Sequence, residues 1–161
     1  MESPRSDDDA RECIGRLLDD ATDLTARFLS DRTELSASAA YAMHRVSLEG
    51  PIRLTALAAK EGVSQPSMTQ LMQRLERADL VARVPDPDDG RACLIAITEQ
   101  GQALLDNRRR TRRKRLQQFL ASLSPEDEHA LTLAASVASP ILARLTTDAD
   151  SATGPDVATD S

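Results

Sequence analysis

Hydrophobic and polar positions between residues 54 and 98 change from a helical to a strand periodicity. In residues 65–77 the apolar side chains recur at i, i+3, i+4 and i+7, which predicts an amphipathic helix with one buried stripe. The stripe consists of Met68, Leu71, Met72 and Leu75. Residues 80–84 and 93–97 are short apolar runs separated by turn-forming and charged residues, so they predict a β-hairpin with a long tip.

The residues just before this helix have the chemistry of a tight turn between two helices. Thr55 is a candidate N-cap of a short helix that ends at Lys60. Gly62 is expected to adopt the left-handed conformation of the turn, and Val63 to fill its corner. Ser64 is a candidate N-cap of the second helix. Two short helices joined in this way predict a helix-turn-helix motif.

The second helix has a polar face opposite its apolar stripe, rich in amides and hydroxyls and basic toward its end. The candidate DNA-contacting residues are Ser64, Gln65, Ser67, Thr69, Gln70, Arg74 and Arg77. Short amide and hydroxyl side chains suit base edges in a major groove, whereas arginines suit phosphates. A solvated helix surface would have a similar composition, and Arg74 could instead pair with Asp89, so both alternatives stay open.

Residues 63–101, VSQPSMTQLMQRLERADLVARVPDPDDGRACLIAITEQG, resemble the core of the MarR family of transcriptional regulators. The tripeptide from Asp89 to Arg91 fits the Asp-x-Arg that is typical of the family's wing tip, and the resemblance extends over residues 35–101. It implies a winged helix-turn-helix fold. It also implies that Arg91 enters the minor groove and that Asp89 helps to hold the wing by charge pairing.

Further helices are predicted on both sides of this core. Their expected ranges are residues 10–30, 35–47, 99–121 and 125–145, and residues 52–54 are expected to add a third strand. The first helix and the last two carry more apolar surface than one chain can cover. We therefore expect a closed, two-fold symmetric homodimer, and the family resemblance implies that the terminal helices form its interface.

The expected fold class is mainly α with a small β-hairpin wing: a winged helix-turn-helix core with terminal dimerisation helices. Residues 10–145 are expected to form a single domain, in which residues 35–98 are the winged helix-turn-helix. Residues 10–34 and 99–145 are its expected dimerisation helices. The acidic ends, residues 1–9 and 146–161, are expected to be disordered.

The net charge of -6 and the pI of about 4.9 argue at first against a nucleic-acid partner. The distribution of charge weakens this objection. Residues 1–9 carry a net charge of -3 and residues 146–161 carry -4, so the rest of the chain carries +1. DNA binding is therefore expected to be moderate and sensitive to salt.

Several classes of protein are not supported by the sequence. The acidic start has no apolar core typical of a signal peptide, and no run approaches the roughly 18 apolar residues of a membrane helix. Cys13 and Cys93 lie too far apart for a disulfide scaffold or zinc motif. No catalytic constellation, phosphate loop or metal motif is present. The expectation is a soluble cytoplasmic protein that is not an enzyme and has no cofactor.

The segment from Arg108 to Arg115 has seven basic residues in eight positions. One interpretation is an additional phosphate contact, and another is a solvated helix face. A third is pairing with carboxylates of the dimerisation region such as Asp19, Asp20 and Asp23. The sequence does not decide among them.

The predicted function is sequence-specific binding of double-stranded DNA, with the two recognition helices of a homodimer about one DNA turn apart on a pseudo-palindromic operator. The family resemblance implies a repressor released by a small-molecule effector, which would bind between the dimer helices and the winged helix. Tyr41 and His44 lie one helical turn apart and are candidates for that crevice.

Two alternatives remain. Some family members sense peroxides with a cysteine near the position of Cys13, although they surround it with tyrosines and Tyr41 is the only tyrosine of this chain. The winged helix could also be a protein-interaction module without affinity for DNA.

Overall fold

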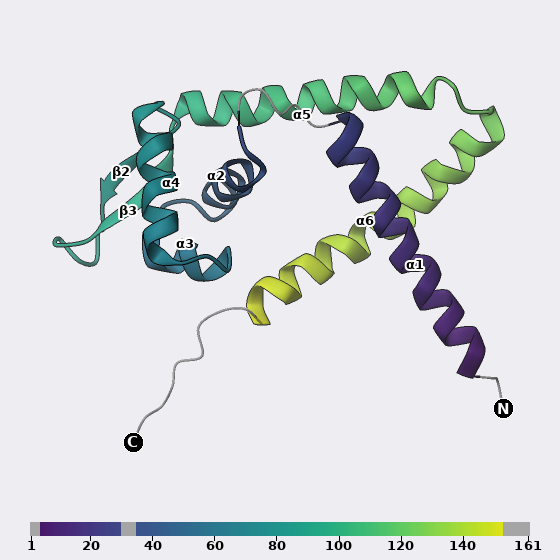
Figure 1. Ribbon diagram of the computed structural model, residues 1–161, viewed down its shortest axis with the longest axis horizontal. Coiled ribbons are helices and arrows are strands. Elements are labelled where there is room, and N and C mark those ends of the chain that lie inside the picture. The colour runs from purple at the N-terminus through teal and green to yellow at the C-terminus, as the bar shows by residue number, and fades with distance from the viewer. Residues whose placement is uncertain (1–3, 30–34, 153–161) are drawn as a thin grey trace.

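A short three-stranded sheet and three short helices form one lobe of the protein, and a long helix leads from it toward two further helices (Figure 1). The computed structural model describes residues 4–29 and 35–152. The elements are α1 (Pro4–Leu24), a π-helical turn η1 (Thr25–Leu29), α2 (Ala37–Glu49), β1 (Ile52–Arg53), α3 (Leu54–Lys60), α4 (Gln65–Arg77), β2 (Val81–Pro85), β3 (Cys93–Ile97), α5 (Glu99–Leu120) and α6 (Pro125–Ala152). The predicted fold class, mainly α with a small β wing, is confirmed.

The hydrophobic core lies in the lobe, between α2, α3, α4, the sheet and the first turns of α5. The predicted stripe of α4 is confirmed, because Met68, Leu71, Met72 and Leu75 are all buried. They pack with residues of α2 such as Met43. Burying one face of α4 in this way holds its opposite face toward solvent.

The sheet is antiparallel, with strand order β1-β3-β2. Ile52 of β1 pairs with Ile95 of β3, which confirms the predicted third strand. The hairpin begins one residue later than expected, at Val81, because the N–H of Leu80 still belongs to the end of α4. That N–H donates to the Leu75 carbonyl at 2.9 Å.

The end of α4 is fixed to the start of the wing. Asp79 adopts a left-handed backbone with φ of 57°, and its N–H donates to the Glu76 carbonyl at 3.0 Å. Together with the bond from Leu80 to Leu75, this is the hydrogen-bond pattern of a Schellman cap. The side chains of Leu75 and Leu80 are both buried, as that motif favours. The chain therefore enters β2 directly from α4.

The turn between α3 and α4 agrees with the sequence at two positions and differs at two. Gly62 has the expected positive φ of 62°, and the Ser64 side chain accepts a hydrogen bond from the Ser67 N–H at 3.3 Å. Val63 does not fill the corner: its side chain is 43% exposed, and its backbone N–H closes the turn by donating to the Ala58 carbonyl. Thr55 is not a cap, because α3 already begins at Leu54, directly after β1.

The start of α5 is joined tightly to the end of α4. Thr98 caps α5 through its hydroxyl, which accepts from the Gly101 N–H at 3.0 Å and donates to the Asp79 carbonyl at 2.6 Å. The backbone N–H of Thr98 donates to the Leu80 carbonyl at 3.2 Å. A Cβ added to Gly101 would lie 2.8 Å from Ile97 Cδ1 and nearer still to the Leu80 carbonyl oxygen. Glycine is therefore required for this close approach.

Both chain ends are more helical than expected. Helix α1 begins at Pro4, so the prediction of disorder over residues 1–9 is wrong for residues 4–9. Proline is favoured in a first helical turn, where its missing N–H removes no hydrogen bond of the helix. Helix α6 continues to Ala152, so disorder is also a wrong prediction for residues 146–152. Residues 1–3 and 153–161 of these two predictions, and residues 30–34 of the first dimerisation segment, lie outside the described residues.

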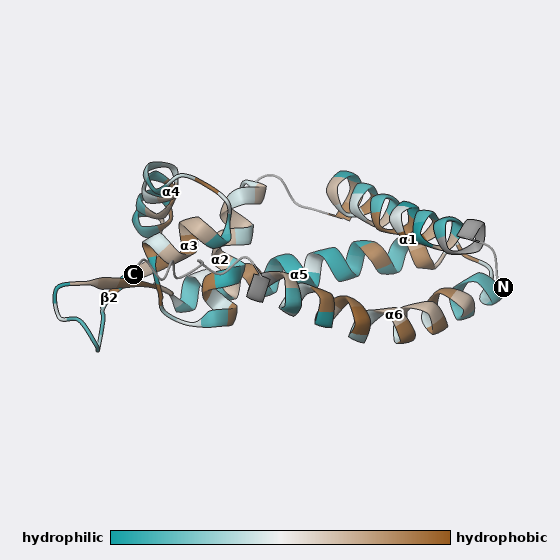
Figure 2. Cartoon of the chain, turned by 90° about the horizontal axis from the view of Figure 1, so that it is seen from below, coloured by the Kyte–Doolittle hydropathy of each residue, from teal (hydrophilic) through white to brown (hydrophobic). Residues whose placement is uncertain are grey.

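The helices outside the lobe expose wide apolar faces, and in Figure 2 α1 and α6 lie on opposite sides of α5. The exposed large side chains include Ile14, Leu17, Leu131, Val137 and Leu145. By length and composition, the segment Pro125–Ala149 is long and apolar enough to cross a membrane, although the sequence analysis expected no such run. Serine and threonine interrupt this segment, but an 18-residue window within it still has a mean hydropathy of 1.3, and none of that window is buried within the chain.

Candidate nucleic-acid interface

The outward face of α4 is polar and basic. Gln65, Gln70, Arg74 and Arg77 are exposed on it, in agreement with their predicted positions. The only acidic residue of α4 is Glu76, whose carboxylate lies 3.4 Å from Arg83 Nε of β2. The ion pair with Arg83 compensates the charge of Glu76. The exposed face of α4 therefore presents amide and guanidinium groups without an unpaired carboxylate among them.

Three of the predicted contact residues use their hydroxyls within the helix. The Ser64 hydroxyl caps α4 and lies 2.9 Å from the Ser67 hydroxyl. Thr69 is half-buried, and its hydroxyl donates to the Gln65 carbonyl at 2.8 Å. Ser64 and Ser67 remain exposed at the N-terminus of α4, where backbone N–H groups favour an anion. Thr69 is thus the least available of the predicted base-reading residues.

The tip of the wing carries Arg91 with its side chain exposed. The backbone N–H of Arg91 donates to Asp89 Oδ1 at 3.1 Å, and the Ala92 N–H donates to the Asp89 carbonyl at 2.9 Å. Asp89 therefore shapes the turn that presents Arg91. The alternative pair between Arg74 and Asp89 is not among the ion pairs that the described residues form.

The base of the wing is held by a different carboxylate from the one expected. Asp86 is 6% exposed, and its Oδ2 accepts hydrogen bonds from Arg53 Nε at 2.9 Å and Arg53 Nη2 at 2.7 Å. Asp89, in contrast, is half exposed and reaches Arg53 only at 4.0 Å. The predicted charge pairing of Asp89 is thus a minor contact, and Asp86 with Arg53 forms the main clamp between β1 and the wing.

Asp86 also organises the turn that follows it. Its Oδ1 accepts from the Asp88 N–H at 3.0 Å, the geometry of an Asx turn. This bond, followed by the hydrogen bond from Arg53, lowers the pKa of the Asp86 carboxyl below its ordinary value. The Asp-Pro-Asp sequence was the available signal for such a turn. The partner Arg53 lies 33 residues earlier, so no local pattern could have indicated it.

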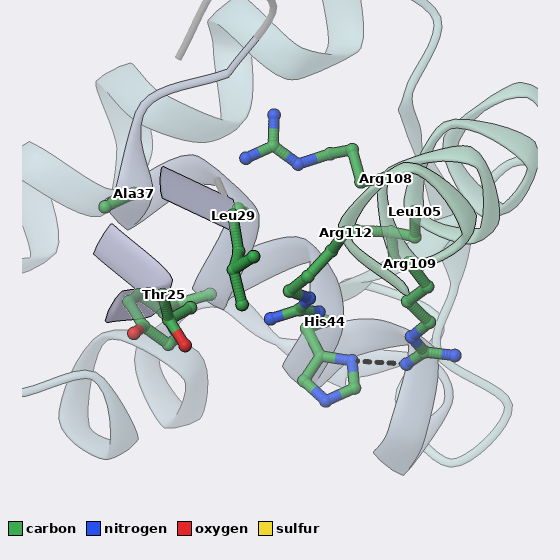
Figure 3. Close-up of a pocket in the computed structure, with 10 residues that line it drawn as sticks. Thr25, Leu29, Ala37, His44, Leu105, Arg108, Arg109 and Arg112 are labelled. Carbon is green, nitrogen blue, oxygen red and sulfur yellow. Dashed lines mark hydrogen bonds between the residues drawn. The ribbon is translucent and has the colours of Figure 1, made fainter. Parts of the chain in front are cut away.

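A cavity of about 250 Å³ lies between η1, α2 and α5 (Figure 3). Tyr41 and His44, the candidates for an effector crevice, both line it. Arg108, Arg109 and Arg112 project into it from α5. The basic segment of α5 therefore turns part of its charge inward, toward α2.

His44 is bonded to this basic segment. Arg109 Nη2 lies 2.9 Å from His44 Nδ1, and because a guanidinium can only donate, Nδ1 accepts and carries no proton. Burial, followed by the positive charges of Arg109, Arg112 and Arg45, lowers the pKa of His44 below its ordinary value. Both effects favour the neutral imidazole over its charged form.

Arg109 of the basic segment does not contact the carboxylates that were predicted as its partners. It contacts Asp106 at 3.7 Å and His44 instead. Asp23, one of the expected carboxylates, lies 3.8 Å from Arg27 instead. Arg109 and Asp106 are one turn apart on α5, so their pairing needs no second chain.

The two cysteines are exposed free thiols in α1 and β3. Among the residues that the structure describes, no group of three or more His, Cys, Asp or Glu side chains is arranged to hold a metal ion.

Comparisons with known proteins agree with this geometry. The sequence model of the MarR family matches residues 35–93. The chain is 36% identical over 100 residues to an HTH-type transcriptional regulator of Mycobacterium bovis, covering 62% of this chain and 70% of the relative. It is 37% identical over 57 residues to the HTH-type transcriptional repressor NicR of Pseudomonas putida, which covers 35% of this chain and 36% of that protein.

Solved structures extend the likeness beyond the lobe. The transcriptional regulator Tm0710 from Thermotoga maritima superimposes with a TM-score of 0.69 at 20% identity, covering 84% of this chain and 98% of that one. At this identity the match concerns the fold. The covered share is larger than the winged-helix lobe alone, so the match extends into the helices outside it.

Proposed function

Because the chain belongs to the MarR family of DNA-binding transcriptional regulators, we propose that it is a repressor. In this proposal it binds a pseudo-palindromic operator as a homodimer and is released by a small-molecule effector. The family consists of transcriptional regulators rather than enzymes. The name of the relative NicR, a transcriptional repressor, supports the proposed sign of regulation.

The observation that carries the proposal is the pairing of an exposed amide- and arginine-rich face on α4 with an exposed arginine at the wing tip. Gln65 and Gln70 have the amide groups that suit base edges, and Arg74 and Arg77 suit phosphates. Arg91 at the wing tip suits the minor groove. Ser64, Ser67, Thr69 and Asp89 position these groups or contact the backbone of DNA.

The proposed homodimer is supported by apolar surface that the described part of the chain leaves uncovered. Leu131, Leu133 and Val137 of α6 are each about half exposed or more, as are Ile14 and Leu17 of α1. Apolar patches of this extent are typical of protein interfaces. A two-fold pair presents two copies of α4 about one DNA turn apart, which matches a pseudo-palindromic site.

The proposed effector site is the cavity beside Tyr41 and His44. Helix α5 connects this cavity to the DNA-binding lobe, because the same helix carries Arg109 in the cavity and is capped by Thr98. Thr98 is bonded to the end of α4. In one state of the dimer the spacing of the two α4 helices fits the operator, and in another it does not. An effector that binds the second state more tightly would shift the dimer population toward that state and so release the DNA.

The test is a titration of DNA from the region upstream of the gene, followed by fluorescence anisotropy at two salt concentrations. We expect saturable binding that weakens with salt. Arg77→Ala, which removes a proposed phosphate contact, is expected to reduce the salt slope by roughly one unit, and Arg91→Ala is expected to weaken binding to the operator. Gln70→Ala is expected to weaken binding to the operator more than to unrelated DNA. Gln118→Ala, an exposed change on α5, is the matched control and is expected to bind normally.

Absence of DNA binding at low salt would instead favour a protein-interaction module. The redox alternative rests on the exposed thiol of Cys13 in α1. It predicts that alkylation of Cys13 releases the operator, and that Cys13→Ser abolishes this effect. Unchanged operator affinity after complete alkylation would rule it out.

A further inference from the structure

Five half-buried side chains form a continuous polar chain between α2 and α5. Gln102, Asp106 and Arg109 lie at i, i+4 and i+7 of α5, so they share the face of that helix that meets α2. Helix α2 supplies His44 and Ser47, which are three residues apart. We call these five residues the α2–α5 strap.

Gln102 is the centre of the strap because its amide forms bonds in both directions. Its Oε1 accepts from the Ser47 hydroxyl at 2.6 Å, and its Nε2 donates to Asp106 Oδ1 at 3.2 Å. Asp106 Oδ1 then lies 3.7 Å from Arg109 Nη1, and Arg109 Nη2 lies 2.9 Å from His44 Nδ1. The strap therefore leaves α2 at Ser47 and returns to it at His44.

The strap adds directional contacts to a junction that is otherwise apolar. Leu105 of α5 lies between the strap residues in the sequence, and its side chain is buried in the hydrophobic core. Apolar contact depends on buried area and not on direction, so it resists separation of α2 and α5 more than it resists their sliding or rotation. Hydrogen bonds weaken steeply when they are misaligned. The strap is therefore expected to fix the angle between the two helices.

The strap lies where α5 leaves the winged-helix lobe. Thr98 and Gly101 hold the start of α5 close to the end of α4. The segment from Gln102 to Arg109 extends this attachment by about two turns. Beyond Arg109, α5 continues to Leu120 and leads toward α1 and α6 (Figure 1). The direction of α5 at the strap thus determines how the lobe is oriented relative to the helices proposed to form the dimer.

A small change of this direction is large on the scale of DNA. Helix α5 has 22 residues and is therefore about 33 Å long. A rotation of about 6° at one end of such a helix displaces the other end by about 3.4 Å, the distance between successive base pairs. A two-fold dimer contains two straps, so the orientation of both lobes depends on them. A dimer that distinguishes operators by one base pair of spacing must hold this angle to within a few degrees.

We propose that Gln102 is a positioning residue that, through Ser47 and Asp106, sets the spacing of operator half-sites that the dimer accepts. The proposal rests on the function proposed above, because it requires a homodimer on a pseudo-palindromic operator. None of these three side chains lines the cavity beside Tyr41 and His44. The three residues act through the direction of α5 and need no contact with DNA or with an effector.

The test compares duplexes that differ only in spacing. The parent duplex is the pseudo-palindrome that the unmodified protein selects from a random-sequence library, and two others have one base pair more or fewer between the half-sites. A fourth duplex carries a single half-site. Fluorescence anisotropy with the full-length protein measures the affinity for each duplex. We expect the unmodified protein to lose about tenfold in affinity on either change of spacing, the scale of one lost base contact.

Gln102→Ala and Ser47→Ala each remove a hydrogen bond of the strap. Both are expected to reduce this discrimination about threefold, the scale of one neutral hydrogen bond, and to leave the affinity for the single half-site unchanged. Ser47→Thr keeps the hydroxyl, and Gln118→Ala changes an exposed side chain farther along α5, so both are expected to keep the full discrimination.

The single half-site separates positioning from a general loss of stability. A variant that is only less stable would bind the single half-site less tightly and would keep the ratio of affinities between spacings, and this result would overturn the proposal. Full discrimination by Gln102→Ala would also overturn it. So would an equal loss of discrimination in Ser47→Ala and Ser47→Thr, because only the first of these variants removes the hydroxyl.

A measurement without DNA separates this inference from the function on which it rests. Nitroxide labels at Gln73→Cys, an exposed position of α4, report the distance between the two lobes of a homodimer by pulsed electron paramagnetic resonance. The exposed Cys13 and Cys93 are replaced by serine in this protein. We expect Gln102→Ala to broaden the distance distribution and Gln118→Ala to leave it unchanged. An unchanged distribution in Gln102→Ala beside normal operator binding overturns this inference alone, whereas the absence of any distance between protomers overturns the proposed homodimer and this inference with it.

Discussion

The close packing of α5 against the end of α4 predicts a large effect from the addition of one methyl group. In Gly101→Ala the new Cβ would lie 2.8 Å from Ile97 Cδ1 and 3.0 Å from the Leu80 carbonyl carbon, with the carbonyl oxygen closer still. Carbon atoms pack at about 3.5–4.0 Å, so the helix must move by about 1 Å. The obstacle includes backbone, which cannot swing aside as a side chain can.

The expected magnitude follows from what that movement disturbs. Overpacking usually costs about 1–3 kcal/mol, and the loss of each neutral hydrogen bond costs about 0.5–1.5 kcal/mol. The bonds at risk are those from Thr98 to Asp79 and Leu80, and from Gln100 to Ala78. We expect a loss of about 2–4 kcal/mol in the free energy of unfolding, or roughly 5–15 °C in melting temperature for a chain of this length.

Thermal unfolding followed by circular dichroism measures this effect. The matched control is Gly15→Ala in α1, where an added Cβ meets nothing within 4 Å. Alanine is the better helix former by about 0.5–1 kcal/mol, so the control is expected to be neutral or stabilising. Operator affinity is also expected to fall in Gly101→Ala, since α4 loses its fixed orientation. A melting temperature within about 2 °C of the unmodified protein would refute the reasoning.

Three further predictions concern the parts that present the DNA-binding groups. Asp86→Asn removes the charge that faces Arg53, so it is expected to loosen the wing and weaken operator binding. The control Asp88→Asn changes an exposed side chain and is expected to leave operator affinity unchanged. Equal operator affinities of the two variants in anisotropy titrations would contradict this prediction. The pKa of Asp86 is lowered in the folded protein. The clamp between Asp86 and Arg53 is therefore expected to stabilise the wing fully above about pH 4, where aspartate ordinarily titrates. This stabilisation is expected to be lost as the pH falls through the lowered pKa. The amide shift of Asp88 in NMR reports this loss, and a midpoint at or above the ordinary aspartate value would contradict it. Ser64→Ala is expected to lower the free energy of unfolding by about 1 kcal/mol through loss of the α4 cap, measured by urea denaturation.

The sequence was sufficient for several features that depend on neighbours along the chain. The stripe of Met68 to Leu75 has helical spacing, the turn at Gly62 requires a left-handed residue, and Ser64 precedes the helix that it caps. Arg91 was placed at the wing tip by its local turn and by family resemblance. These features need no information about distant residues.

Two of the features that were missed depend on interactions between distant segments. Asp89 and Asp86 are equivalent in the sequence as wing carboxylates, and only the approach of Arg53 from β1 makes Asp86 the buried one. Likewise, the inward direction of Arg108 depends on how α5 packs against η1 and α2. The helical start at Pro4 was missed because the acidic residues after it also have the composition of a disordered tail.

The central claim is that a symmetric pair of α4 helices and wings reads DNA. The most direct measurement is selection of bound duplexes from a random-sequence library with the purified protein, repeated with Arg91→Ala. We expect enrichment of a pseudo-palindrome whose half-sites are about 10 base pairs apart, with weaker selection by the variant. Recovery of duplexes without any enriched sequence, or of a single asymmetric half-site that both proteins select equally, would contradict it.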